Sequence, residues 1–269
     1  MNLLRVEPEA RTRIESFLQT FKKSSRPLLL LDYDGTLADF RIDRFKAYPW
    51  AGLRELLTRI QRQGRTEMRV ITGRPPEEVP PLLGLSPPLE VWGLHGAKRL
   101  YPDGRSEQEE TPRETREKLD EVRVQLRRDA FGGLYEDKPN AAVVHWRGIP
   151  PARAKLIEQK TRALFEPLAS NDGLSLLVFE SGLELRTGRD KGGAVREIAR
   201  EAASGTPVVY LGDDFTDESA FVAVNELEGP HLSVLVRRAW RETAANAWIK
   251  PPEELKGFLE RWLDALRHA

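Results

Sequence analysis

Four consecutive leucines, Leu28 to Leu31, run directly into two carboxylates at Asp32 and Asp34. An uninterrupted apolar run of this length, bounded by the turn-forming Gly35, is typical of a strand that is buried on both faces of a sheet. Burying an unpaired carboxylate is costly, and two carboxylates close together also repel each other. The stretch therefore predicts a buried parallel strand whose end needs compensating cations from elsewhere in the chain.

The same strand signature recurs along the chain and alternates with amphipathic helices. Further short apolar runs occur in MRVITGR, LEVWGLHGA, PVVYLGDD and HLSVLV. Helical spacing predicts helices at about 8–23 and 49–62, one that ends near residue 203, a short one from Asp217 and a last one from about Pro252. This alternation predicts an α/β fold in which a parallel sheet carries helices on both faces.

The pattern changes in the middle of the chain. Predicted helices at 113–128 and 150–169 are each followed by a pair of strands, in GLYEDKPNAAVVHWRG and GLSLLVFESGLELRT. Helix, hairpin, helix, hairpin is typical of an α+β layer rather than of a parallel sheet. We therefore predict a discontinuous core made of residues 1–99 and 187–269, with a smaller α+β domain inserted at 100–186.

Composition excludes several classes of function. The 269 residues include 42 Lys and Arg, 42 Asp and Glu and no cysteine. The charge balance argues against nucleic acid or an anionic membrane as partner, and the lack of cysteine excludes disulfides, thiolate metal sites and cysteine catalysis. The first 25 residues lack a signal-peptide pattern, and no segment approaches the roughly 20 apolar residues that span a bilayer. We expect a cytoplasmic protein.

Polar clusters end the predicted core strands or begin a core helix, at the edge where ligands bind in open α/β sheets. The clusters are Asp32 with Asp34, Thr72 with Gly73, Lys191 with two glycines, and Asp213 with Asp214 and Asp217. Carboxylates after a buried strand predict a hard cation such as Mg²⁺. A carboxylate can attack phosphorus while a lysine and a hydroxyl neutralise phosphoryl oxygens. The clusters together predict a phosphoryl-transfer site.

The order and spacing of these motifs resemble the haloacid dehalogenase superfamily over nearly the whole chain. The insertion between the Thr and Lys motifs resembles members of that superfamily that carry a large α/β cap. The resemblance implies a HAD-like Rossmannoid core and assigns a role to each motif residue. It implies a nucleophile (Asp32), a general acid/base (Asp34), phosphate ligands (Thr72 and Lys191) and Mg²⁺ ligands (Asp32, the Asp34 backbone and Asp213), with Asp214 and Asp217 ligating or orienting nearby.

Longer stretches narrow the resemblance to the trehalose-6-phosphate phosphatases. These stretches are DYDGTL, GLHGA, EDKPNAAVVHWR, LELRTGRDKGGAV and LGDDFTDESAF. The resemblance implies hydrolysis of trehalose 6-phosphate to trehalose and phosphate through an aspartyl-phosphate, and it leaves open a functional coupling to a trehalose-6-phosphate synthase. It further implies sugar-hydroxyl contacts from the cap (Glu136, Lys138 and Glu184) and contacts near the sugar phosphate (His95 and Arg147, with Arg74 as a further candidate phosphate ligand).

A structural role remains open for several of these residues. Thr72 could cap the helix expected from about Pro75, and Asp217 could cap the helix that follows it. His95 could be a structural histidine at a hinge. Glu136 and Lys138 alternate onto one strand face, where a plain surface pair is the simpler interpretation.

Two departures from the family pattern bear on the choice of sugar. The chain reads Ala38-Asp39-Phe40 after DGTL, where the family often has a proline-containing loop, and PNAAVVHWR is only an approximate match. Other substrates therefore stay open, among them glucosylglycerol phosphate, mannosylglycerate phosphate and sucrose phosphate. A non-catalytic sugar-phosphate-binding partner of a synthase is a further alternative, which the intact catalytic motif residues argue against.

Overall fold

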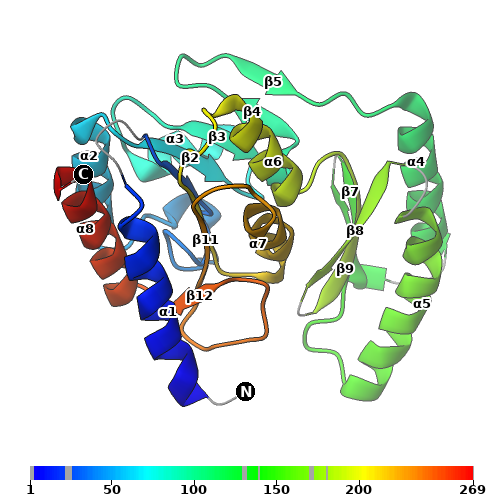
Figure 1. The fold of residues 1–269 in the computed structure, drawn as a ribbon. Coiled ribbons are helices and arrows are strands. Elements are labelled where there is room, and N and C mark those ends of the chain that lie inside the picture. Colours follow the sequence, from blue (N-terminus) through cyan, green and yellow to red (C-terminus); the bar gives the residue numbers. More distant parts are fainter. Residues whose placement is uncertain are drawn as a thin grey trace. The chain divides into compact units, whose positions relative to one another are not determined.

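The computed structural model describes residues 3–21, 26–128, 132–138, 140–169, 173–179 and 181–268. The chain divides into two compact units, which we describe separately (Figure 1). The first unit comprises residues 1–108 and 190–269, and the second comprises residues 109–189.

The first unit is built on an eight-stranded sheet with the strand order β12-β11-β10-β1-β2-β3-β4-β5. Its strands are β1 (Leu28–Leu31), β2 (Glu67–Ile71), β3 (Glu90–Gly93), β4 (Lys98–Leu100), β5 (Ser106–Gln108), β10 (Val208–Gly212), β11 (His231–Val236) and β12 (Ala247–Ile249). The pairs from β12 to β3 are parallel, whereas β4 and β5 run antiparallel. The predicted parallel sheet is confirmed, and β1 lies inside it between β10 and β2.

Helices pack on both faces of this sheet, as predicted. One face carries α1 (Leu3–Leu18), α2 (Leu53–Gln63), α3 (Val79–Leu83) and α8 (Glu253–His268), and the other carries α6 (Lys191–Glu201) and α7 (Glu218–Asn225). Leu29 and Leu31 of β1 enter the first core, whereas Leu28 and Leu30 enter the second. The four leucines are thus a strand buried from both sides. None of the helices in the described part of the chain combines the length and apolar character needed to cross a membrane.

Several element boundaries differ from those predicted. The second helix begins at Leu53 rather than at Pro49, with Gly52 in the left-handed conformation at its N-cap. The first helix ends at Leu18, and its expected end at Lys23 lies outside the described residues. Strand β12 was not predicted, because a three-residue strand is too short to show a pattern.

The polar stretch after β3 also belongs to the first unit. Strands β4 and β5 form a hairpin around a Pro-Asp-Gly turn, and β4 pairs with β3. The division between the units therefore falls after residue 108, whereas we expected the insertion to begin at residue 100. The polar sequence of β5 concealed this hairpin, because all three of its residues are exposed and none is apolar.

The second unit is a four-stranded antiparallel sheet with the order β6-β7-β9-β8. Its elements are α4 (Arg113–Arg128), β6 (Tyr135–Lys138), β7 (Ala141–His145), α5 (Pro151–Ala169), β8 (Leu174–Phe179) and β9 (Gly182–Thr187). The predicted order of helix, hairpin, helix, hairpin is confirmed. Apolar residues of both helices pack on one face of the sheet, on side chains such as Ala142, Val144 and Leu185.

Candidate active site

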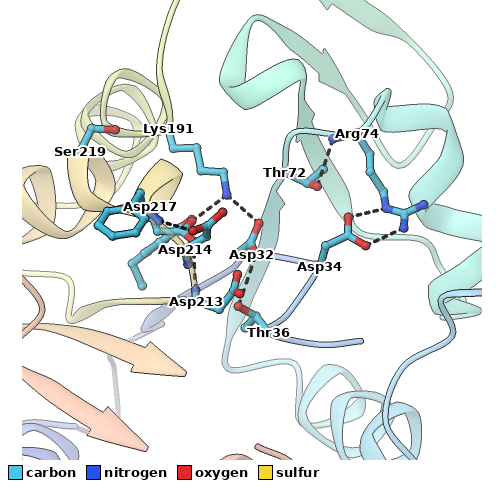
Figure 2. Close-up of polar contacts among 12 residues, drawn as sticks. Asp32, Asp34, Thr36, Thr72, Arg74, Lys191, Asp213, Asp214, Asp217 and Ser219 are labelled. Carbon is cyan, nitrogen blue, oxygen red and sulfur yellow. Dashed lines mark hydrogen bonds and ion pairs between the residues drawn. The ribbon is translucent and has the colours of Figure 1, made fainter. Parts of the chain in front are cut away.

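Adjacent strand ends bring the acidic motifs of the first unit together. Strands β1 and β10 pair in parallel with Leu31 opposite Leu211, so Asp32 and Asp213 leave the sheet side by side. Carboxylate oxygens of Asp32, Asp213 and Asp217 lie within 4.8 Å of one another, and all three residues are buried (Figure 2). The first carboxylate thus meets partners that are about 180 residues away in the chain.

Lys191 supplies the cation that the sequence demanded. Its Nζ donates to Asp32 Oδ1 and to Asp217 Oδ1, both at 2.7 Å, and its side chain is 3% exposed. Burial lowers the pKa of Lys191, but the carboxylates of Asp217 and Asp32 outweigh burial and raise it. The ammonium therefore stays charged. Asp190 holds the lysine at the first position of α6, because its carboxylate accepts from Gly193 N at 2.7 Å and so caps the helix.

The cluster remains short of positive charge. Three buried carboxylates against one ammonium leave two negative charges when all are ionised. Accordingly, burial raises the pKa of Asp32 to about 7, and burial together with Asp32 and Asp217 raises the pKa of Asp213 well above its usual range. Oxygen donors with two uncompensated negative charges fit a divalent hard cation such as Mg²⁺.

Gly35 allows this close approach of β1 and β10. Its φ is +82°, and a Cβ placed there would lie 2.0 Å from Asp213 Oδ2. The Asp213 carboxylate thus occupies the space that any other residue at position 35 would fill. The neighbouring Thr36 donates its hydroxyl to Asp32 Oδ2 at 3.3 Å, which orients the carboxylate of Asp32.

Asp217 is the most heavily bonded of the three carboxylates. Besides Lys191, its Oδ1 accepts from the Tyr210 hydroxyl, and its Oδ2 accepts from the backbone N–H groups of Asp213 and Asp214. Asp217 stands at the N-cap position of α7, as the alternative interpretation allowed, but its side chain makes no capping bond to that helix. Tyr210 was not among the predicted site residues; its hydroxyl in a buried strand was the available signal, since a buried phenol needs a partner.

Asp214 lies at the edge of the cluster. Its Oδ1 accepts from Phe215 N at 2.7 Å and caps the short turn that contains Asp217. Asp214 is partly buried, unlike Asp213 and Asp217. Its part in metal binding stays a prediction, as does that of Asp217.

Arg74 contacts the second carboxylate of the first motif. Its Nε and Nη2 each donate to an oxygen of Asp34 at 2.6 Å, and its Nη1 donates to the Arg44 carbonyl at 2.8 Å. Thr72, at the end of β2, is buried, and its Oγ1 accepts from Arg74 N at 3.2 Å. The hydroxyl proton of Thr72 is thereby left to be donated, and no side-chain cap from Thr72 forms on the next helix. Phosphate binding by Arg74 and Thr72 stays a prediction.

His95 lies against the turn that follows Thr72. It has φ +58°, which is unusual for a residue with a side chain, and its backbone N–H donates to the Thr72 carbonyl at 2.8 Å. A Cβ at Gly73 would lie 2.7 Å from His95 Nε2, so the imidazole packs directly on this glycine. The position is compatible with both of the roles left open for His95.

The predicted sugar-contacting residues gather on the sheet face of the second unit that is opposite its helices. Glu136 pairs with Val143, which pairs with Glu184, so both glutamates share this face. Lys138 donates to Glu184 Oε2 at 2.9 Å. His145, which was not predicted because its strand register was uncertain, lies 2.8 Å from Glu136 Oε2.

Arg147 and Glu184 differ in their exposure to solvent. Arg147 is exposed in the turn that follows β7, beyond the end of the strand. Glu184 is 4% exposed and lies in the middle of β9. The roles of these cap residues stay predictions.

Comparisons with known proteins point to one family. The family model described as trehalose-phosphatase matches residues 30–248 of the chain. The chain is 30% identical over 251 residues to the trehalose-phosphate phosphatase of Mycolicibacterium paratuberculosis, a match that covers 89% of this chain and 63% of that protein. The chain thus spans less than two thirds of the length of that relative.

Solved structures agree on the fold. The trehalose-6-phosphate phosphatase of Aspergillus fumigatus superposes with a TM-score of 0.73 at 23% identity, over 95% of this chain and 97% of that chain. A haloacid dehalogenase-like hydrolase from B. subtilis superposes with a TM-score of 0.59 at 19% identity, over 87% of this chain and 98% of that chain. The expected HAD-like architecture is confirmed.

Proposed function

The chain belongs to the trehalose-phosphatase family, and on that premise we propose that it hydrolyses trehalose 6-phosphate to trehalose and phosphate in a Mg²⁺-dependent reaction. The observation that carries the proposal is the buried cluster of Asp32, Asp213 and Asp217 around Lys191. A structural ion pair needs one carboxylate for one lysine. Two carboxylates at the ends of the adjacent strands β1 and β10, and a third from the short turn before α7, carry unbalanced charge and suit a site that binds a cation and a phosphate together.

Asp32 is the nucleophile in this proposal. Its carboxylate attacks the phosphorus of the 6-phosphate, the bond from phosphorus to the sugar oxygen breaks, and the phosphoryl group is transferred to Asp32 as an aspartyl-phosphate. Lys191 donates to Oδ1 of Asp32 and Thr36 donates to Oδ2, so both oxygens of the nucleophile are held in place. The remaining proton of the Lys191 ammonium and the hydroxyl of Thr72 are available to phosphoryl oxygens.

Asp34 moves the protons. It protonates the leaving sugar oxygen, and then it accepts a proton from the water that attacks the aspartyl-phosphate. The two bonds from Arg74 use one lone pair on each Asp34 oxygen, so each oxygen keeps a lone pair on which a proton can be carried. Arg74 thus orients Asp34 without blocking proton transfer.

The residues fit a bound Mg²⁺. Asp32, Asp213 and the Asp34 backbone carbonyl would hold it, and the uncompensated charge of the cluster supports this assignment. When bound, Mg²⁺ offsets the repulsion between the attacking carboxylate and the phosphate oxygens.

Recognition of the sugar falls to the second unit in this proposal. Glu136, Lys138 and Glu184 share one sheet face, and charged groups of both signs suit the many hydroxyls of a disaccharide. We add His145, because it contacts Glu136 and so restricts the orientation of that carboxylate. His95 and Arg147 remain our candidates for contacts to the sugar phosphate. The proposal also implies functional coupling to the synthase that supplies the substrate.

Phosphate release across a panel of sugar phosphates, each with and without EDTA, tests the proposal. We expect trehalose 6-phosphate to give the highest kcat/KM and EDTA to abolish the release. A higher kcat/KM for sucrose phosphate, glucosylglycerol phosphate or mannosylglycerate phosphate would show that the protein is a phosphatase with a different sugar phosphate as its substrate. An absence of Mg²⁺-dependent release from every member would favour a non-catalytic sugar-phosphate-binding protein.

A further inference from the structure

The carboxylate of Asp217 has no acceptor position left for a metal ion. A carboxylate offers about four lone-pair positions, two on each oxygen. Oδ1 of Asp217 accepts from Lys191 Nζ and from the Tyr210 hydroxyl, and Oδ2 accepts from Asp213 N at 3.0 Å and from Asp214 N at 2.9 Å. All four positions are therefore occupied by protein donors, and the residue is completely buried.

Asp32 differs from Asp217 in this respect. It accepts a hydrogen bond from Lys191 on one oxygen and from Thr36 on the other. One lone pair on each Asp32 oxygen is thus still available for a cation or for attack on phosphorus. Distance alone would make all three carboxylates candidate metal ligands. The hydrogen bonds show that Asp32 still has acceptor positions for a cation, whereas Asp217 has none.

Tyr210 is the donor that completes the set around Asp217. It lies in the middle of β10, is fully buried, and packs its ring edge-on against Phe221 with 5.7 Å between ring centroids. The ring cannot move without displacing the core between the sheet and α7. The hydroxyl is therefore a rigid donor at a fixed place beside the Lys191 ammonium.

We propose that Asp217 binds no metal and is a positioning residue for Lys191, and that Tyr210 is a second positioning residue that holds Asp217 in place. The proposal rests on the phosphatase function proposed above. The Lys191 ammonium has three protons, and Asp217 and Asp32 take two of them. The direction of the third is then set by geometry, and this proton is the one left for a phosphoryl oxygen.

Loss of the Tyr210 hydroxyl releases one side of Asp217. The two backbone N–H groups still hold Oδ2 in Tyr210→Phe, whereas Oδ1 keeps only its bond from the Lys191 ammonium. The charge of the cluster is unchanged in this variant, so a change in metal affinity cannot come from net charge. In Asp217→Asn, by contrast, the side-chain amide turns either its NH₂ group or its carbonyl oxygen toward Lys191 and Tyr210. The NH₂ group cannot accept their hydrogen bonds, and the carbonyl oxygen accepts them more weakly than a carboxylate.

The test measures kcat and KM for trehalose 6-phosphate, Mg²⁺ affinity by calorimetry without substrate, and orthovanadate binding in the presence of Mg²⁺. For Tyr210→Phe we expect kcat and vanadate affinity to fall about tenfold or more, as a misplaced catalytic group does, with Mg²⁺ affinity within about threefold of wild type. Tyr101→Phe is the control, because it also removes a bond from a phenol to a carboxylate, at Glu107, outside the site. We expect no change in this control.

Three results would overturn the proposal. A Mg²⁺ affinity that falls more than tenfold in Tyr210→Phe, which keeps the charge of the cluster, would make Asp217 a ligand. A Tyr210→Phe enzyme with a lower melting temperature but wild-type kcat and vanadate affinity would make Tyr210 only structural. Equal losses of kcat and vanadate affinity in Tyr101→Phe would show that the effect does not depend on the contact between Tyr210 and Asp217. The metal and vanadate measurements need no turnover, so they decide these points even when the sugar panel gives no activity.

Discussion

Arg74 holds both carboxylate oxygens of Asp34, with Nε and Nη2 each 2.6 Å from an oxygen. Arg74 is 7% exposed, and its Cζ also lies 5.3 Å from the ring centroid of Tyr33. A bidentate pair of this kind fixes the plane of the carboxylate as well as its position. The residue that we propose moves protons is therefore oriented by a rigid partner on the neighbouring strand end.

Removal of this partner should slow the chemical step. We expect Arg74→Ala to lower kcat by about 10²-fold, because general acid–base catalysis depends on the placement of Asp34. Steady-state kinetics with trehalose 6-phosphate measure this. Arg105→Ala is the control, because it also removes a bond from an arginine to an aspartate, at Asp103, outside the site. A loss confined to KM would show instead that Arg74 binds the substrate phosphate.

Gly35 should tolerate no side chain. In Gly35→Ala the new methyl group would overlap the Asp213 carboxylate, and the left-handed backbone adds roughly 1–2 kcal/mol of strain. We expect loss of Mg²⁺ binding and of activity. Gly64→Ala is the matched control, because Gly64 has φ +67° with nothing within 4 Å of the added atom. The control should have a lower melting temperature but normal Mg²⁺ binding and activity. A comparable loss of Mg²⁺ binding in both variants would show that overlap with Asp213 is not the cause.

Metal binding should stabilise the fold through the charge of the cluster. Three buried carboxylates share one lysine, so a divalent cation relieves their repulsion. We expect Mg²⁺ at a hundredfold excess over its Kd to add about 2.7 kcal/mol to the free energy of unfolding, and EDTA to remove it. Thermal unfolding with and without Mg²⁺ measures the effect.

Two asparagine variants sharpen this prediction. Asp213→Asn should raise the melting temperature in EDTA, because it removes one of the repelling charges, and should lose most of the response to Mg²⁺. Asp214→Asn should keep most of the response, since asparagine can still cap the turn at Phe215. The reverse order of the two variants would show that Asp214 is the main ligand.

Substitutions on the sheet face of the second unit should lower the hydrolysis of sugar phosphates more than that of simple phosphate esters. We expect Glu184→Gln and Lys138→Ala to lower kcat/KM for trehalose 6-phosphate by about 10- to 100-fold, because each weakens or removes the bond that holds these two charged groups in place for sugar hydroxyls. Hydrolysis of p-nitrophenyl phosphate should change less than threefold. Arg162→Ala, on α5, is the control with no expected effect on either substrate. Equal losses on both substrates would place these residues outside sugar recognition.

Much of the fold could be predicted because it is encoded locally. Leu28–Leu31 read as a doubly buried strand, and Arg113–Arg128 was predicted with its observed bounds, since apolar spacing over short segments reports burial directly. The hairpin of β4 and β5 was missed because both strands have three residues, β4 is only half-buried and β5 is exposed. Short strands of this kind depend on the neighbouring strand for their pairing rather than on their own sequence.

The sequence by itself determined which chemical groups stand at the strand ends, because each motif is contiguous with its strand. Only the tertiary structure decided how these groups pair. Arg74 contacts Asp34, Tyr210 completes the bonds of Asp217, and His145 contacts Glu136. These contacts join different strands and helices, so they depend on register and side-chain rotamers that no local pattern contains. For that reason the two carboxylates after the four leucines could be recognised from the sequence, whereas their partners could not all be named.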